Sequence, residues 1–238
     1  MIAKAANAVL PRGLSNALTP HIRIDSYLDL WVVRPMNGQR TRLRTSFLLS
    51  QLVKPSIAIE SGSYLGTTTQ YLVSLVSEKT YSIEVNAEFA AVAKARLESD
   101  IHSGRIEIVD GDSAVEMPRI LGGLDSKSHT VFAYLDAHWL EHIPLRDEVQ
   151  ALLEWGGDFV AVVDDFYIPS DLGYGYDQYR NHRVDISHIP NSDKISVWVP
   201  EDDSSTESGA HRGTAYIVSS RFKDLVTAES KNLKLRKY

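Results

Sequence analysis

Short apolar runs alternate with helix-like stretches along most of this chain, beginning at Ile57. Apolar residues recur at helical spacing in the stretches between the runs. The five runs lie at 57–59, 81–85, 106–109, 131–135 and 159–163. Strands that alternate with helices form right-handed βαβ units, which build a parallel sheet. The pattern therefore predicts an α/β fold with helices on both faces of the sheet.

The pattern changes after Asp165. Residues 166–194 are rich in Gly, Tyr, Pro, Asn and His, and two more strand-like runs follow at 195–199 and 214–219. A hairpin-like pair at the end of a parallel sheet adds an antiparallel edge strand. We therefore predict a doubly wound, mostly parallel seven-stranded sheet with an antiparallel edge strand.

The N-terminal region is expected to be a separate structural element. Residues 21–34 and 41–53 show helical spacing, and no strand-like run precedes Ile57. We expect residues 1–50 to form a helical arm or cap, and residues 51–238 to form the single main domain. Such an arm is also a route to a homo-oligomer, through packing on a partner subunit.

Composition excludes several classes of function. The 238 residues carry a net charge of −6, which argues against nucleic-acid binding, and they include no cysteine. Disulfides, thiolate zinc sites and cysteine nucleophiles are thereby excluded. No apolar run approaches the ~18 residues of a membrane span. We expect a cytoplasmic protein that acts on a small molecule, with no nucleic-acid or membrane partner.

Acidic residues recur where the predicted parallel strands end. Carboxyl ends of parallel strands open on one side of a sheet, and ligands bind there. These acids are therefore expected to line one crevice. They are Glu60, Glu84, Asp110, Asp112, Asp136, Asp164 and Asp165.

A glycine turn follows the first predicted strand, between Gly62 and Gly66. Glycine lets the backbone approach a ligand closely. The spacing is G-x-x-x-G, so the third glycine of a dinucleotide-binding G-x-G-x-x-G fingerprint is missing, and no lysine follows as in a phosphate-binding Walker loop. A nicotinamide oxidoreductase and a nucleoside triphosphatase are therefore disfavoured.

The order of these motifs resembles the class I S-adenosylmethionine-dependent methyltransferase family. The matching features are E-x-G-x-x-x-G-[ST] from Glu60 to Thr67, the strand-terminal acid Glu84 and Gly-Asp-Ser at 111–113. The resemblance covers roughly residues 45–220 and implies a Rossmann-like fold. It also implies a cofactor site built from Glu60, Gly62, Ser63, Gly66, Thr67, Glu84, Asp112 and Ser113.

The resemblance assigns each part of the cofactor to a group of residues. Glu84 would accept the ribose hydroxyls, and Asp112 with Ser113 would bind the adenine. The glycine turn would approach the methionine moiety, and Glu60 would favour its ammonium group.

A second group of polar residues follows the fourth and fifth predicted strands. Asp136, Asp164 and Asp165 offer carboxylate oxygens of the kind that Mg²⁺ prefers. Their positions resemble the metal-dependent sugar and macrolide-sugar O-methyltransferase branch of the family. We predict these three residues as metal ligands and predict catalytic roles for His138, as a general base, and for Asp136.

These motifs favour an S-adenosylmethionine-dependent methyltransferase that uses Mg²⁺ to methylate a hydroxyl on a sugar-like or phenolic diol. One alternative is a metal-independent methyltransferase that acts on N, C or O. Another is a protein of the same fold that binds S-adenosylmethionine without transferring its methyl group.

Overall fold

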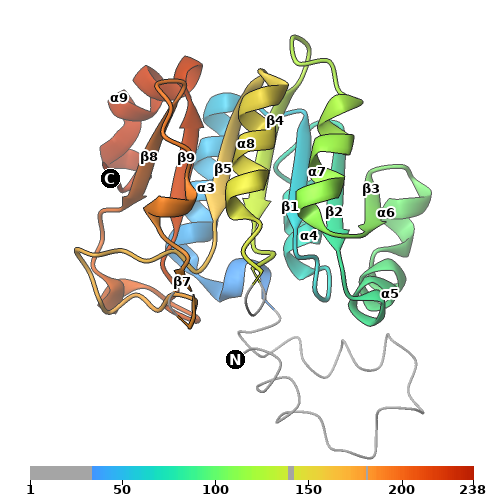
Figure 1. The fold of residues 1–238 in the computed structure, drawn as a ribbon, viewed down its shortest axis with the longest axis horizontal. Helices are drawn as coiled ribbons and strands as arrows, with labels where there is room; N and C mark the ends of the chain where they lie inside the picture. The colour runs from blue at the N-terminus through green and yellow to red at the C-terminus, as the bar shows by residue number, and fades with distance from the viewer. Residues whose placement is uncertain (1–33, 139–141, 181) are drawn as a thin grey trace, which may run out of the picture.

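A mixed eight-stranded sheet forms the centre of the computed structural model, which describes residues 34–138, 142–180 and 182–238 (Figure 1). The strand order is β10-β8-β9-β5-β4-β1-β2-β3. These strands are β1 (Ile57–Ser61), β2 (Lys79–Glu84), β3 (Ile106–Asp110), β4 (Thr130–Leu135), β5 (Asp158–Val163), β8 (Ile195–Pro200), β9 (Ala215–Ser219) and β10 (Leu235–Lys237). Two short strands, β6 (Gln178–Tyr179) and β7 (His182–Arg183), pair separately.

Helices cover both faces of the sheet. In Figure 1, α7 and α8 lie in front of the sheet, whereas α3 and α4 lie behind it. The α-helices are α3 (Arg40–Val53), α4 (Thr67–Val73), α5 (Ala87–Arg96), α6 (Glu98–His102), α7 (Ser113–Gly122), α8 (Leu145–Trp155) and α9 (Lys223–Leu233). Short 3-10 turns are η2 (Pro35–Gly38), η3 (Ile186–His188), η4 (Ser204–Thr206) and η5 (Ser220–Phe222).

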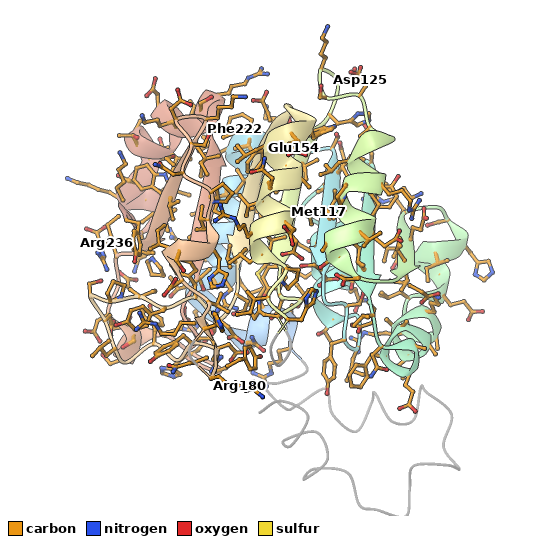
Figure 2. All side chains as sticks on the ribbon, viewed as in Figure 1. Met117, Asp125, Glu154, Arg180, Phe222 and Arg236 are labelled. Atoms are coloured by element: carbon orange, nitrogen blue, oxygen red, sulfur yellow. The ribbon has the colours of Figure 1, made fainter. Side chains whose placement is uncertain are left out.

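Alternate residues of the central strands enter two different hydrophobic cores. In β4, Val131 and Ala133 pack with Met117 of α7 in one core (Figure 2), whereas Phe132 and Tyr134 pack in the core on the other face. Successive strand side chains point to opposite faces, so a strand covered on both sides is apolar throughout. This double burial explains the continuous apolar runs of the sequence.

The observed sheet confirms the predicted fold class and adds one strand to it. β3, β2, β1, β4 and β5 are parallel, and β9 is antiparallel to both of its neighbours, β5 and β8. The reversed strand β9 therefore lies inside the sheet, and β10, which is antiparallel to β8, forms the edge. β10 spans only Leu235–Lys237, which is too short to give a periodic signal.

The predicted N-terminal arm falls largely outside the described residues. Of the helix expected over 21–34, the structure describes only Arg34. The helix expected over 41–53 is α3, and the expected domain boundary between residues 50 and 51 falls within it. In the parts of the chain that the structure describes, no helix is both long and apolar enough to cross a membrane.

The order of the strands selects one region of the sheet for ligand binding. β1 lies between β2 and β4, so β2 and β3 follow on one side of β1, whereas β4 and β5 follow on its other side. Ligands of open α/β sheets bind at such a switch point, outside the carboxyl ends of the strands. Arg180 lies toward that end of the molecule, and the exposed Asp125 lies at the opposite end (Figure 2).

Candidate functional site

The glycine turn lies directly after β1 and touches the segment that follows β4. Gly62 and Gly66 have positive φ angles of 85° and 75°, which residues with a side chain rarely adopt. A Cβ atom on Gly62 would lie 2.6 Å from the carbonyl oxygen of Asp136. The turn and the Asp136 segment are therefore in backbone contact, which only glycine permits at this position.

Glu60 places a buried carboxylate beside this turn. Its Oε2 atom accepts hydrogen bonds from the hydroxyls of Thr69, at 2.5 Å, and Ser82, whereas Oε1 is buried without a hydrogen-bond partner among the described residues. Burial raises the pKa of Glu60 to about 8, and the two hydroxyls oppose that shift. A buried, unpaired carboxylate oxygen is costly, so Oε1 suits a cationic ligand group.

Glu84, at the end of β2, is held by backbone amides. Its two carboxylate oxygens accept hydrogen bonds from the amides of Tyr64, at 2.8 Å, and Asn86, at 2.9 Å. Burial raises the pKa of Glu84, and hydrogen bonds from Asn86, Tyr64 and Val85 lower it. Because Tyr64 belongs to the glycine turn, Glu84 ties that turn to the end of β2.

The remaining predicted cofactor residues lie at the same end of the sheet. The hydroxyl of Ser63 lies 2.5 Å from that of Ser82, and Thr67 is the first residue of α4. Asp112 caps α7 by accepting a hydrogen bond from the Ala114 amide at 2.9 Å, and it also lies 3.1 Å from His142 Nε2. Ser113 begins α7 and is buried, and its hydroxyl acts to lower the pKa of the nearby Glu148.

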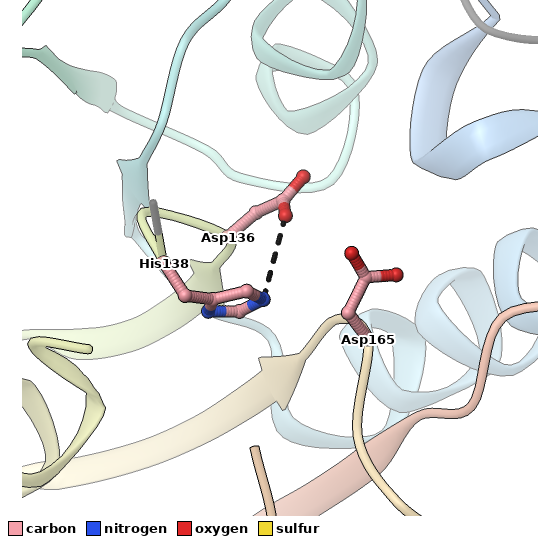
Figure 3. Close-up of side chains that lie close together, drawn as sticks. All are labelled: Asp136, His138 and Asp165. Atoms are coloured by element: carbon pink, nitrogen blue, oxygen red, sulfur yellow. Dashed lines mark ion pairs between the residues drawn. The ribbon is translucent and has the colours of Figure 1, made fainter. Parts of the chain in front are cut away.

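A cluster of potential metal-binding groups lies just beyond β4 and β5. One ligand atom from each of Asp136, His138 and Asp165 lies within 4.8 Å of the other two (Figure 3). The carboxylate of Asp165 points toward the other two side chains. The side chain of Asp136 is 28% exposed, whereas those of His138 and Asp165 are each 2% exposed, so Asp136 is the most exposed member of the cluster.

His138 is the buried nitrogen donor of this cluster. Its Nε2 atom lies 3.7 Å from Asp136 Oδ1 and has no hydrogen-bond partner in the described ranges. Burial lowers the pKa of His138, which favours the neutral imidazole. A neutral ring with a free nitrogen can accept a proton or bind a metal.

Asp164 lies outside this cluster, although the sequence predicts it as a ligand. Its Oδ1 forms an ion pair with Arg42 at 2.5 Å, and its Oδ2 accepts a 2.5 Å hydrogen bond from the Tyr134 hydroxyl. Burial acts to raise the pKa of Asp164, but Arg42 and the hydrogen bonds outweigh it and lower the pKa. The third member of the cluster is therefore His138, whereas the sequence predicts Asp164.

Two residues next to the cluster, Asp177 and Arg212, were not predicted. Arg212 forms ion pairs with both Asp165 and Asp177, and the Tyr179 hydroxyl donates a hydrogen bond of 2.5 Å to Asp177. These residues come from loops, where neither periodicity nor a strand end marks them. Their one sequence signal is a location in the Gly- and Tyr-rich segment 166–194 or in the polar loop 200–213.

Acidic groups outnumber basic groups in and around the cluster. Four carboxylates, of Asp136, Asp164, Asp165 and Asp177, lie close to two guanidinium groups, of Arg42 and Arg212, so these six groups would carry a formal charge of −2 if all of them were ionised. Desolvation and the charge of Asp164 raise the pKa of Asp165 to about 8, against the effect of Arg212. Desolvation and the charges of Asp164 and Asp165 raise the pKa of Asp136 well above its ordinary value. These shifts favour protonation of Asp136 and Asp165, and a bound divalent cation would favour their ionised forms instead.

Comparisons with known proteins identify the fold. The chain matches a methyltransferase from Geobacter sulfurreducens with a TM-score of 0.52 and 12% identity, over 92% of this chain and 94% of the other. It matches an O-methyltransferase from Bacillus cereus in complex with SAH with a TM-score of 0.51 and 14% identity, over 92% of this chain and 100% of the other. No protein-family model and no curated protein sequence matches the chain. At these identities, the shared feature is the Rossmann-like fold seen in these methyltransferases.

Proposed function

We propose that this protein is an S-adenosylmethionine-dependent O-methyltransferase that uses Mg²⁺ and acts on a small molecule with adjacent oxygen atoms. The observation that carries the proposal is the backbone contact between Gly62 and Asp136. This contact supports the proposal because the turn that would hold the methyl donor lies next to the cluster that would hold a cation and accept a proton.

The cofactor part of the proposal is supported by a buried polar atom that lacks a partner. Glu60 Oε1 is buried and has no hydrogen-bond partner among the described residues. Glu60 would bind the ammonium group of S-adenosylmethionine, and Asp112 with Ser113, at the start of α7, would bind the adenine. Glu84, oriented by two backbone amides, would accept the ribose hydroxyls.

The metal part of the proposal rests on the charge and chemistry of the donor set. Asp136 and Asp165 would hold Mg²⁺ because hard cations favour carboxylate oxygens over imidazole nitrogen. When bound, Mg²⁺ supplies Lewis-acid chemistry that favours ionisation of a hydroxyl at neutral pH. The formal charge of −2 that the four carboxylates and two guanidinium groups would carry when ionised supports a divalent ion.

His138 is then available as the general base. Burial favours its neutral form, and its Nε2 atom lies beside Asp136 without a hydrogen-bond partner among the described residues, so it could take the proton of the acceptor hydroxyl. The acceptor oxygen would attack the sulfonium methyl carbon as the carbon–sulfur bond breaks. The glycine turn and the cluster would hold the two reactants together, an effect worth up to roughly 7–11 kcal/mol in well-oriented systems.

A methyl-transfer assay tests the proposal. The full chain is incubated with S-adenosylmethionine and either a phenolic or a sugar diol, with Mg²⁺ or with a chelator, and S-adenosylhomocysteine is measured. We expect product with Mg²⁺ and none after chelation. Full turnover in the chelator would favour the metal-independent alternative. Cofactor binding without turnover on either acceptor class would favour the non-methylating alternative.

A further inference from the structure

We propose that Asp164 is a positioning residue rather than a metal ligand: together with Arg42, it fixes the turn that directs Asp165 into the cluster. This inference rests on the proposed metal site. It reverses the role that the sequence predicts for Asp164, and it gives α3 a part in the site.

The carboxylate of Asp164 has no capacity left for a cation. Its Oδ1 contacts Arg42 Nη1 at 2.5 Å and accepts the Asp165 amide at 2.6 Å. Its Oδ2 accepts the Tyr134 hydroxyl at 2.5 Å and the Asn37 side-chain amide at 2.8 Å. A carboxylate offers about four lone-pair positions, and these four donors match that number.

Arg42 is also fully buried, and its guanidinium group makes several further hydrogen bonds. Its side chain is 1% exposed, and that of Asp164 is 0% exposed. The guanidinium group also donates to the Thr214 hydroxyl at 2.7 Å and to the Arg212 carbonyl at 3.0 Å. Arg42 therefore joins α3 to the end of β5 and to the segment before β9. Breaking a buried pair of this kind by removing one partner leaves an uncompensated charge.

The consequence of the pair appears at the next residue. Asp165 has a φ angle of 55°, a left-handed conformation that is uncommon for a residue with a side chain. Its amide is held by Asp164 Oδ1, and its carbonyl oxygen accepts the Asp177 amide at 3.0 Å. In this conformation the Asp165 carboxylate faces Asp136 and His138 (Figure 3).

The two possible roles of Asp164 predict opposite effects of replacing Arg42. If Asp164 were a ligand, removal of its competing cation would leave metal affinity unchanged or increase it. If Asp164 positions Asp165, removal of Arg42 would loosen the turn and weaken metal binding. Loss of such an outer partner typically weakens metal binding 10- to 100-fold.

Manganese binding to the full chain, measured by electron paramagnetic resonance, distinguishes the two roles. We expect Arg42→Met to weaken Mn²⁺ binding at least tenfold, Arg42→Lys to restore part of the loss, and Arg44→Met to have no effect. Arg44 is the matched control because it is an exposed arginine of the same helix. Unchanged or tighter binding by Arg42→Met would overturn the inference.

Amide hydrogen exchange is a second measurement of the same role. It still tests that role if Arg42→Met folds poorly or if the unmodified protein binds no metal. Asn37→Ala removes one peripheral donor to Asp164. We expect faster amide hydrogen exchange across residues 164–168 in Asn37→Ala and in Arg42→Lys than in Arg44→Met. Equal exchange rates in the three variants would refute the positioning role. Failure of the unmodified chain to bind Mn²⁺ would instead refute the metal part of the proposed function, and the exchange rates would still decide whether Asp164 fixes the turn.

Discussion

Gly62 lies so close to Asp136 that a methyl group on Gly62 would come within 2.6 Å of the Asp136 carbonyl oxygen. The proposed methyl-donor turn and the proposed metal cluster therefore share a backbone contact. A change in this contact is expected to affect both parts of the site. The first prediction tests this relationship.

Gly62→Ala is expected to reduce S-adenosylhomocysteine affinity at least tenfold, measured by calorimetry, and to lower thermal stability. Alanine would meet the Asp136 carbonyl and would also adopt a φ of 85°, which costs about 1–2 kcal/mol. Gly104→Ala is the control, since Gly104 has a φ of 79° but open space around its Cβ position. If both variants bound the ligand equally, the steric argument would be wrong.

The affinity for S-adenosylhomocysteine is expected to increase as the pH rises from 6 to 8. Burial raises the pKa of Glu60 to about 8, so at lower pH the carboxyl must release its proton before it can pair with the ligand's ammonium group. The expected gain is up to about tenfold per pH unit below that value, because one proton is released per ligand bound. Calorimetry at pH 6, 7 and 8 measures it. Glu60→Gln should bind weakly and lose this pH dependence, and a slope that persists in the variant would assign the effect to another group.

Glu148→Gln is expected to stabilise the protein at pH 8 relative to the unmodified chain. Burial raises the pKa of Glu148 from 4.5 to about 7, against the effect of the nearby Ser113 and Ser61 hydroxyls. Between these values the folded state retains a proton that the unfolded state releases. Stability should therefore fall as the pH rises from 4.5 to about 7, by at most roughly 3 kcal/mol.

Urea unfolding at pH 5 and pH 8 measures this contribution of Glu148. The difference between the unmodified chain and Glu148→Gln isolates it from other groups that titrate in the same range. Glu154→Gln, which alters an exposed glutamate of the same helix, is the control. A pH dependence that is the same in Glu148→Gln and in the unmodified chain would contradict the prediction.

His138→Gln is expected to lower kcat about 100-fold or more while leaving Mn²⁺ affinity within a factor of about three. Removal of a general base typically costs 10²- to 10⁴-fold in rate. Rapid-mixing kinetics and metal titration of the same variant separate the two quantities. A parallel loss of Mn²⁺ affinity would show that His138 is a ligand, as its place among the three clustered donors also allows.

Periodic patterns were sufficient to predict the central fold. The strands expected near residues 57, 81, 106, 131 and 159 all occur in the parallel part of the sheet. Their side chains alternate between two buried faces, and that burial is visible in the sequence as continuous apolar runs. α9 and β10 were not predicted, since no apolar run comparable to the central strands marks the last residues of the chain.

The shared location of several predicted site residues at one end of the sheet was also predictable, because it follows from strand direction. Glu60, Glu84 and Asp136 come at or just after the ends of parallel strands, so they had to reach the same end of the sheet. Asp177 and Arg212 were not predictable in this way. They lie in loops, and their meeting depends on how two segments that are distant in sequence fold against each other.

Asp164 and Asp165 show which features follow from local sequence pattern and which follow from tertiary structure. In the sequence they are two equivalent acids after one strand, and local pattern alone brings both to the ligand-binding end of the sheet. Their different roles come from Arg42, Tyr134 and Asn37, which occupy the first carboxylate, and from the φ of 55° that turns the second toward Asp136. Strand order is encoded in local periodicity, but a side chain's partners depend on donors that only the folded chain brings within hydrogen-bonding distance.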